Sequence, residues 1–536
     1  MTTVAELLRG RAADDADALY FEDRTWTYRQ LVDEASRRAG LFERMRDDDR
    51  PPHIGVLLDN VPDYLFWLAA AGLSGSVVVG INSTYRGDQL AQLVRHTDCQ
   101  LLVTTTALRP LLEGTATGIA RDRVLLADSA EYAAALDGDG PLPTAPVGQD
   151  DLFLLIFTSG STGLPKAVRC TQGRYRRTGT HVAKIAGLGT GDAVYSPLPF
   201  FHSSSLFTGW ASAITAGIPI ATRRRFSASG TLPDVRRFGA TMLTYTGKVL
   251  NYILATPPEP GDADNPLRLA VGNEASGRDI EEFARRFGCV VRDSYGSTEG
   301  IIIIRRDPSM PPGALGSAES SVLVVDPETG AGCPPVTFDA DGRPTNLAEA
   351  TGEIVETQPA AGFEGYYKND EATSSRFRDG WYWSGDLAFR DAEGWLYFAG
   401  RSNEWLRVDG ENFAAAPVEA IVAAHPHVRS VAVYAVPDEP VGDRVMVALE
   451  LASGSAFDPG AFDAFLDEQP DLGTKWRPAF VRVTDELPKL ASMKIDKQRL
   501  RAEAWRAERV YWRPDNGGPL RLLNDADRSR LDPLLG

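Results

Sequence analysis

One segment of the chain combines the residue types that phosphate binding needs: Thr158-Ser159-Gly160-Ser161-Thr162-Gly163-Leu164-Pro165-Lys166. Glycine admits backbone conformations that other residues avoid, so consecutive N–H groups can converge on one anion. The hydroxyls add hydrogen-bond donors and the lysine adds a positive charge. The segment follows the apolar run 152–157, which suits a buried strand. It therefore predicts a polyphosphate-binding loop, the alternative being a flexible Ser/Gly linker.

This loop differs from the Walker pattern GxxxxGK[ST], because its lysine follows Pro165 and precedes Ala167. It resembles the signature [ST]SG[ST]TGxPK of the ANL superfamily of adenylate-forming enzymes, which includes acyl- and aryl-CoA synthetases, adenylation domains of peptide synthetases and firefly luciferase. Ala167 replaces the glycine that is commoner at this position of the signature. In this the chain resembles the branch of long- and very-long-chain fatty acyl-CoA ligases and fatty-acid-transport proteins. The resemblance implies that residues 158–163 and Lys166 bind the phosphates of ATP.

Two further motifs follow in the family's order. Residues 196–202 (SPLPFFH) resemble the segment whose histidine, here His202, borders the acyl pocket. The aromatic residues near it either form an apolar wall of that pocket or pack in the core: Phe200, Phe201, Phe207 and Trp210.

Residues 294–300 (SYGSTEG) resemble the motif YGxTE. The resemblance implies that Tyr295 stacks on adenine, that Thr298 contacts phosphate and that Glu299 helps to hold Mg²⁺. One carboxylate suffices for this cation, because Mg²⁺ prefers oxygen ligands and keeps several waters. The remaining residues implied around the nucleotide are Ser294, Gly296 and Ser297 here, and Gly272, Asn273 and Glu274 in a loop on the adenine side and the pocket floor.

The ribose contacts are implied by two motifs fifteen residues apart. Ser384-Gly385-Asp386 is similar to the family's TGD, and a two-oxygen acceptor such as Asp386 suits a pair of ribose hydroxyls. Gly400-Arg401 matches the family's GR and places a second ribose contact after a predicted hairpin.

Beyond residue 400 the resemblance implies a mobile domain. Asn403 stands at the hinge, where the family usually has Asp or Lys. Residues 408–413 (VDGENF) resemble the GGEN loop, which lines the pantetheine tunnel in the second half-reaction. The residues that this implies for CoA are Gly410, Glu411 and Asn412.

Three of the eight lysines, Lys489, Lys494 and Lys497, lie within nine residues near the C-terminus. Residues 487–494 (LPKLASMK) resemble the family's PKTxSGK, which implies that Lys494 bridges the substrate carboxylate and the α-phosphate. A cation there favours the meeting of two anions. Met493 departs from the usual glycine, and its bulk could restrict how Lys494 enters the site.

The elements that must position these residues are predicted from periodicity. Helices over 28–45 and 89–96 alternate with apolar runs 53–58, 75–80 and 101–105, which indicates α/β structure with buried parallel strands. Strands 381–383, 387–390 and 395–399 follow, and then a smaller unit with helices near 417–424 and 458–468 and strands 430–436 and 444–451. We therefore expect an N-terminal domain 1–400 of stacked mixed sheets, a small mobile α+β domain 401–510 and an extension 511–536 that contains a short helix.

The composition excludes several classes of protein. The chain has 536 residues, 43% of them hydrophobic, and a net charge of −17, which argues against nucleic-acid binding. Its four cysteines form no CxxC pair, so we expect neither a disulfide framework nor a zinc site. We recognise no signal peptide or membrane-spanning run, and therefore expect a cytoplasmic protein. Self-association into a homodimer is left open.

The expected activity is that of an AMP-forming acyl-CoA ligase, with ATP, Mg²⁺ and coenzyme A, acting on a large apolar acid in fatty-acid or secondary metabolism. Three alternatives stay open: an enzyme specialised for one half-reaction, a luciferase-like oxygenase, and a catalytically silent nucleotide-binding protein. No GxSxG nucleophile elbow accompanies the motifs.

Overall fold

A computed structural model describes most of the chain. The described residues are 3–138, 140–158, 165–247, 249–306, 309–311, 313–339, 344–359, 362–401, 405–408, 411–438, 442–469, 472–473, 475–490, 493–514 and 518–535. The chain divides into two compact units, the first formed by residues 1–301, 360–375 and 491–493, and the second by 302–359, 376–490 and 494–536. Each unit contains the sequence of more than one predicted region, and each is described separately below.

The first unit contains a six-stranded sheet that is parallel except at one edge. Its order is β6 (Val124–Leu126), β5 (Leu101–Thr104), β3 (His53–Val56), β4 (Val77–Gly80), β7 (Leu152–Thr158) and β8 (Lys166–Thr171). Every residue of β3, β4 and β5 is buried, which explains their unbroken apolar sequences. The predicted runs 53–58, 75–80 and 101–105 are therefore confirmed as parallel strands, each one to two residues shorter at an end.

A second sheet of the first unit has seven strands and is parallel except for the pair β1–β2. Its order is β13 (Val290–Asp293), β12 (Leu269–Gly272), β11 (Met242–Thr244), β9 (Val194–Tyr195), β10 (Ile220–Thr222), β1 (Asp17–Phe21) and β2 (Arg24–Thr27). The carboxyl ends of its parallel strands carry several predicted site residues, as is usual in α/β folds.

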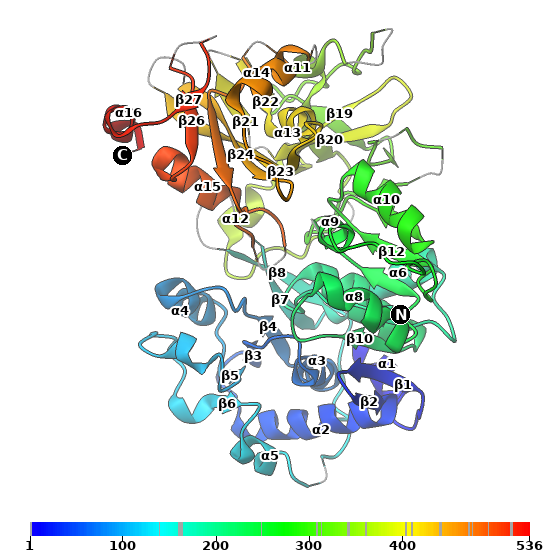
Figure 1. The fold of residues 1–536 in the computed structure, drawn as a ribbon. Helices are drawn as coiled ribbons and strands as arrows, with labels where there is room; N and C mark the ends of the chain where they lie inside the picture. Colours follow the sequence, from blue (N-terminus) through cyan, green and yellow to red (C-terminus); the bar gives the residue numbers. More distant parts are fainter. Residues whose placement is uncertain are drawn as a thin grey trace. The chain divides into compact units, whose positions relative to one another are not determined.

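Helices cover these two sheets (Figure 1). The predicted helix 28–45 is confirmed as α2 (Tyr28–Met45), where the Thr27 hydroxyl accepts from the backbone of Gln30 and the Gln30 side chain accepts from Thr27 in return. The other helices of the unit are α1 (Val4–Arg9), α3 (Pro62–Ser74), α4 (Gly87–His96), α5 (Ala130–Ala135), α6 (Gln172–Ala186), α7 (Ser212–Ala216), α8 (Ala228–Arg237), α9 (Val249–Leu254), α10 (Gly277–Phe287) and α12 (Asp370–Ser374).

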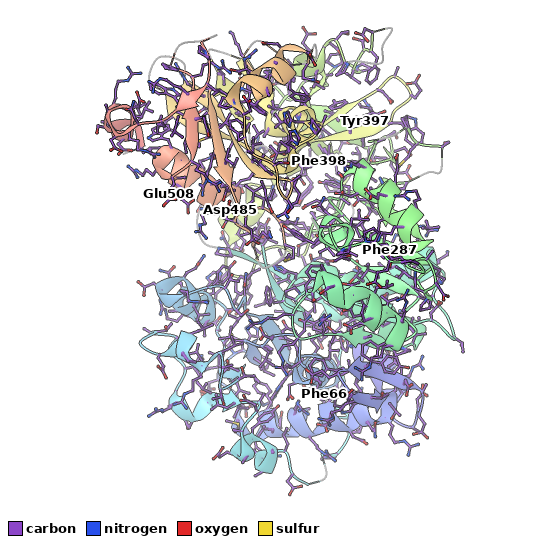
Figure 2. All side chains as sticks on the ribbon, in the orientation of Figure 1. Phe66, Phe287, Tyr397, Phe398, Asp485 and Glu508 are labelled. Atoms are coloured by element: carbon purple, nitrogen blue, oxygen red, sulfur yellow. The ribbon has the colours of Figure 1, made fainter. Side chains whose placement is uncertain are left out.

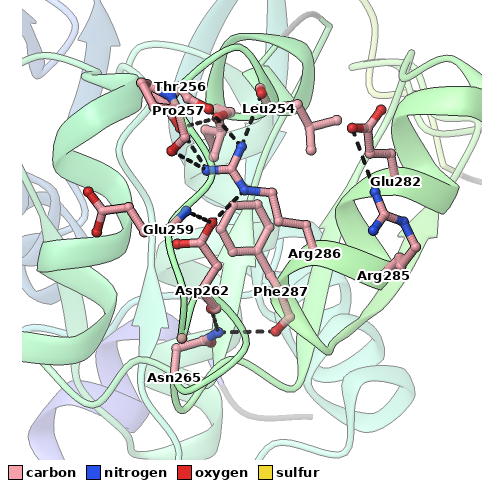
Figure 3. A network of polar contacts seen from close by, with 12 residues as sticks. Leu254, Thr256, Pro257, Glu259, Asp262, Asn265, Glu282, Arg285, Arg286 and Phe287 are labelled. Atoms are coloured by element: carbon pink, nitrogen blue, oxygen red, sulfur yellow. Dashed lines mark hydrogen bonds and ion pairs between the residues drawn. The ribbon is translucent and has the colours of Figure 1, made fainter.

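The core of the first unit is apolar and contains aromatic as well as aliphatic side chains. Phe66 on α3 and Phe287 at the end of α10, both labelled in Figure 2, are each 3% exposed. Next to Phe287, Arg286 hydrogen-bonds the end of α9 and the loop that follows it (Figure 3). It donates to the carbonyl oxygens of Leu254, Thr256 and Pro257 and to the carboxylate of Asp262.

The second unit contains a five-stranded antiparallel sheet in which β19 pairs with three strands. The strands are β16 (Val322–Val325), β17 (Gly352–Glu356), β18 (Phe377–Arg378), β19 (Trp381–Arg390) and β20 (Leu396–Arg401). The sequence predicts two strands over 381–390, but β19 is continuous, with a register shift between Leu387 and Ala388. The short strands β14 (Ile304–Arg305) and β15 (Ser317–Ala318) pair separately, and α11 (Leu347–Ala350) precedes β17.

The other sheet of the second unit has seven strands. Its order is β22 (Glu411–Ala414), β21 (Trp405–Val408), β24 (Gly442–Leu451), β25 (Phe480–Thr484), β26 (Val510–Trp512) and β27 (Arg521–Leu522), with β23 (Val428–Asp438) also paired to β24. Its helices are α13 (Ala415–Ala423), α14 (Pro459–Asp467), α15 (Lys497–Glu503) and α16 (Asp525–Leu531). Residues after 510 thus extend this sheet as well as forming the expected short helix, and Trp512 and Leu531 are buried in its core.

Within the described residues, no helix is long and apolar enough to cross a membrane.

Candidate active site

The predicted phosphate loop connects two paired strands of the first unit. β7 and β8 are antiparallel, and Thr158 and Lys166 are register partners at the point where the pair opens. The Thr158 hydroxyl also lies 3.4 Å from the Lys166 carbonyl oxygen. Residues 159–164, which hold Gly160 and Gly163, lie outside the described part of the chain. The described flanks nevertheless fix where this loop leaves and re-enters the sheet.

A segment 200 residues further along the chain lies beside β8. Arg169 donates its N–H to Gly365, Tyr367 donates its N–H to Ala167, and Tyr366 forms a bridge with Val168. Tyr366 is 3% exposed, and the ammonium group of Lys166 lies 5.2 Å from the centre of its ring. A cation over an aromatic face is an attractive arrangement. The hydroxyl of the same tyrosine donates to Glu299 Oε1 at 2.7 Å.

Glu299 is only 6% exposed, and its backbone carbonyl oxygen accepts a hydrogen bond from an arginine. Arg174, in the first turn of α6, donates to the carbonyl oxygens of Thr298 and Glu299, the latter at 2.9 Å, and to Arg169 at 2.8 Å. Among the described residues, Arg174 forms no ion pair. The positive charge of its guanidinium group therefore attracts an anion bound near this loop.

The same loop contacts the segment predicted to border the acyl pocket. The Thr298 hydroxyl lies 3.1 Å from that of Ser203, directly after His202. A π-helix, Ser204–Ala211, begins there, and π-helical turns occur often at functional sites. The structure thus brings His202 and Thr298 into one neighbourhood.

The aromatic residues around His202 pack mainly in the core. Phe200 and Trp210 are fully buried members of the core cluster, Phe201 is 4% exposed, and Phe207 is half-buried beside it. Of the two alternatives left by the sequence, core packing holds for Phe200 and Trp210. Phe207 is the residue of this group that keeps an accessible face, and Arg174 lies 5.8 Å from its ring.

The residues predicted on the adenine side lie at the ends of β12 and β13. Ser294 donates its N–H to the Gly272 carbonyl oxygen at 2.8 Å, which joins the two strand ends. Asn273 accepts from the Thr246 hydroxyl at 2.6 Å, whereas Glu274 is exposed and has a positive φ of 65°. Glycine is required at 272, because a Cβ there would lie 2.3 Å from the Tyr245 carbonyl oxygen. The half-buried Tyr295 follows on the same turn as Gly296 and Ser297.

In the second unit, the two predicted ribose-binding residues are direct neighbours. Asp386 on β19 and Arg401 on β20 are register partners, so both stand at one position of the ladder. Before Asp386, Gly385 has a φ of 75° and donates its N–H to Glu353 Oε1 at 2.7 Å. Burial raises the pKa of Glu353, an effect that the Gly385 N–H and two arginines oppose and the charge of Asp386 reinforces.

The residues predicted for CoA and for the bridging lysine also belong to the second unit. Glu411 and Asn412 begin β22, where Glu411 pairs with Val408, while Gly410 and the hinge residue Asn403 lie outside the described residues. The Lys494 carbonyl oxygen accepts from the N–H of Leu490 at 2.8 Å.

The lysines on either side of Lys494 are paired with acids, Lys489 with Glu486 and Lys497 with Glu419. Met493, grouped with the first unit, has a φ of 67°, a left-handed conformation that explains why glycine is usual there.

Two buried residues of this neighbourhood were not predicted from the sequence, Arg174 and Tyr366. Neither lies in a motif that was recognised in the sequence, and each reaches the Thr298–Glu299 loop from a distant part of the chain, 125 and 67 residues away. The sequence contains many arginines and tyrosines, and no pattern that was recognised in it singles out Arg174 or Tyr366.

The comparisons with known proteins agree along nearly the whole chain. A family model described as AMP-binding enzyme matches residues 9–367, and one described as AMP-binding enzyme C-terminal domain matches 417–494. A steroid-22-oyl-CoA synthetase of Rhodococcus jostii (strain RHA1) is 45% identical over 516 residues, 96% of this chain and 93% of its own length. The medium/long-chain-fatty-acid–CoA ligase FadD17 of Mycobacterium tuberculosis is 44% identical over 514 residues, 95% of this chain and 98% of its own.

Solved structures share the fold at lower identity. ATP-bound MatB from Rhodopseudomonas palustris has a TM-score of 0.80 at 23% identity and covers 93% of this chain and 98% of its own. The o-succinylbenzoate CoA synthetase of Bacillus subtilis, bound to ATP and magnesium, has a TM-score of 0.75 at 24% identity and covers 92% and 98%. The expected fold class is confirmed, and this chain belongs to the AMP-binding enzyme family of the ANL superfamily, as an AMP-forming acyl-CoA ligase.

Proposed function

We propose that this ligase activates a large apolar carboxylic acid with ATP and transfers the acyl group to CoA. The observation that carries the proposal is the near full-length identity of 45% and 44% to proteins named for a steroid-22-oyl and for medium- and long-chain fatty acyl groups. Both names describe acids with extended apolar skeletons. A ring system and a long chain place the same demand on a pocket, namely the burial of apolar surface.

In this proposal, residues of the first unit bind the phosphates of ATP. The loop after Thr158 supplies backbone and hydroxyl donors, and Lys166 supplies a charge. Thr298 contacts a phosphate. Mg²⁺ fits the buried carboxylate of Glu299, which supplies one hard oxygen ligand, phosphate oxygens and water being the others. The unneutralised charge of Arg174 beneath this loop adds to a field that favours polyphosphate.

The ribose contacts and the bridging cation are assigned to three further residues predicted from the sequence. Asp386 accepts from the ribose hydroxyls and Arg401 contacts the sugar from the paired strand. Lys494 lies between the substrate carboxylate and the α-phosphate. A carboxylate oxygen of the substrate bonds to the α-phosphorus of ATP. The bond from that phosphorus to pyrophosphate breaks, which gives acyl-AMP. Bringing these anions together is a matter of positioning and charge, so no covalent enzyme intermediate is needed.

The second half-reaction uses a different set of residues. The CoA thiol loses its proton to the surrounding water and its sulfur bonds to the acyl carbon, the bond between that carbon and the AMP oxygen breaks, and a thioester and AMP are formed. Gly410, Glu411 and Asn412 line the path of the thin pantetheine arm, and His202 borders the acyl group. Asn403 is the point about which the C-terminal region, residues 401–510, turns between the two half-reactions.

The test is a panel of acids offered with ATP, Mg²⁺ and CoA. We expect mass spectrometry to detect CoA thioesters of steroid side-chain acids or of long fatty acids, and only weak product from acetate or benzoate. Pyrophosphate release without CoA should be slow once acyl-AMP fills the site, and should accelerate when CoA is added. Efficient thioester formation from short or charged acids alone would contradict the proposed substrate class.

The proposal also includes a cytoplasmic location and leaves room for a homodimer. A reducing compartment suits the four cysteines, which are unpaired. Fractionation of the source cell and light scattering of the purified protein test these two points independently of the activity.

A further inference from the structure

The residue that joins the two charged groups of the proposed phosphate site is Tyr366. Its ring face carries the Lys166 ammonium group at 5.2 Å, and its hydroxyl donates to Glu299 Oε1 at 2.7 Å. The two groups have opposite charges, and their residues, Lys166 and Glu299, lie 133 positions apart in the chain. One side chain thus contacts both the cation and the carboxylate.

The backbone around Tyr366 is fixed on both sides. Its own N–H donates to the Thr373 hydroxyl at 3.0 Å, and the following N–H donates to Ala167, the residue next to Lys166. Just before it, Glu364 accepts both the N–H and the hydroxyl of Thr171, each at 2.7 Å. Tyr366 therefore cannot shift without breaking its pairing with β8, and it holds its position relative to Lys166.

We propose that Tyr366 is a positioning residue for the nucleotide: its hydroxyl orients Glu299 for Mg²⁺, and its ring holds Lys166 for the phosphates. The hydroxyl bond occupies one carboxylate oxygen and fixes the plane of the group, as the partners of metal ligands commonly do. The aromatic face attracts the ammonium group and leaves its positive charge in place. This inference rests on the proposed function and adds to it a residue that touches neither substrate nor metal.

Two variants separate the two contacts. Tyr366→Phe keeps the ring and removes the hydroxyl, whereas Tyr366→Leu removes both. The matched control is Tyr195→Phe, because Tyr195 is also fully buried in the first unit and donates to a carboxylate, Asp234, at 2.7 Å. Any loss due only to the deletion of a buried hydroxyl should be equal in Tyr366→Phe and Tyr195→Phe.

The readout is the equilibrium dissociation constant of ATP, measured by calorimetry with excess magnesium and again with EDTA. We expect Tyr366→Phe to raise the constant about tenfold with magnesium, since hydrogen bonds to charged groups are of that strength, and to leave it unchanged with EDTA. Tyr366→Leu should raise both constants, because the support of Lys166 is lost too. Tyr195→Phe should leave both unchanged.

Each outcome has a distinct meaning. If Tyr366→Phe binds ATP as Tyr195→Phe does, or if it weakens binding equally with magnesium and with EDTA, the positioning role is overturned while the proposed function stands. If the unaltered protein binds no ATP under either condition, the proposed function fails and this inference fails with it. A melting temperature for every variant excludes unfolding as the cause of weak binding.

Discussion

Arg174, which is buried, and Arg286, whose side chain is 10% exposed, hold loops of the first unit in the same way, and only one of these loops carries predicted site residues. Arg174 binds the carbonyl oxygens of Thr298 and Glu299, and Arg286 binds those of Leu254, Thr256 and Pro257 (Figure 3).

The difference between them lies in charge. Arg286 is neutralised by the buried carboxylate of Asp262 at 2.7 Å, while Arg174 forms no ion pair with any residue that the structure describes. Arg286 thus combines its loop contacts with an ion pair, whereas Arg174 donates its hydrogen bonds to carbonyl oxygens.

The largest effect on activity should come from Arg174→Met. Without the guanidinium group, Glu299 and Thr298 lose the donors that fix their backbone, and displacements of about 1 Å at such a site cost about a hundredfold in rate. We expect kcat/KM for pyrophosphate release to fall by about that factor. Arg174→Lys, which keeps the charge but not the planar set of donors, should recover only part of it.

The comparison breaks if Arg174→Met keeps its activity at a temperature where circular dichroism shows it to be folded. In that case the charge beneath the loop would serve stability alone, as at Arg286.

Arg286→Met should show the opposite pattern. Its removal leaves Asp262, whose side chain is 7% exposed, without its cation. Breaking a buried ion pair in this way costs about 3 kcal/mol. We expect urea denaturation to show that loss in the free energy of unfolding, while kcat/KM of the folded variant stays within about twofold, a change within what surface effects produce.

A fall in kcat/KM of Arg286→Met as large as that of Arg174→Met would show that the loop after α9 also forms part of the site. The contrast drawn from the two charges would then be wrong.

A further variant, Glu353→Gln, extends the comparison of charged side chains from the two arginines to a buried carboxylate. The Glu353 carboxylate accepts from Gly385 beside Asp386, and burial raises its pKa above the ordinary value. A raised pKa means that the folded state favours the protonated form. The stability from this group is therefore complete below its unfolded pKa and is lost as the pH rises through the folded pKa.

The glutamine amide keeps an acceptor oxygen but does not titrate. Relative to the unaltered protein, Glu353→Gln should gain free energy of unfolding as the pH rises from about 4, and the gain should level off above the folded pKa. Denaturation curves at a series of pH values measure this difference. A difference that is constant with pH would contradict the raised pKa.

The sequence predicted what strand register and local motifs determine. Asp386 and Arg401 were expected on either side of a hairpin, and β19 and β20 pair them directly. Lys166 was expected after a buried strand and begins β8. By contrast, Arg174 and Tyr366 act through contacts between distant segments, which no local pattern encodes. The π-helix after His202 was not predicted either, and three of its residues, Leu206, Trp210 and Ala211, belong to the core cluster.

The smallest effect is expected at Met493, the residue directly before Lys494. Its φ of 67° is left-handed, which costs a residue with a Cβ about 1 kcal/mol. Met493→Gly removes this strain but also the packing of the methionine against the cluster around Tyr245. Met493→Ala removes the same packing and keeps the strain.

The comparison between these two variants therefore isolates the backbone. Glycine should give a free energy of unfolding about 1 kcal/mol higher than alanine, although glycine loses more entropy on folding and is the weaker residue at ordinary positions. Urea denaturation of the two variants measures the difference. If alanine is the more stable, residue 493 does not hold a left-handed conformation in solution, and the usual glycine at this place must be explained by the space around Lys494 alone.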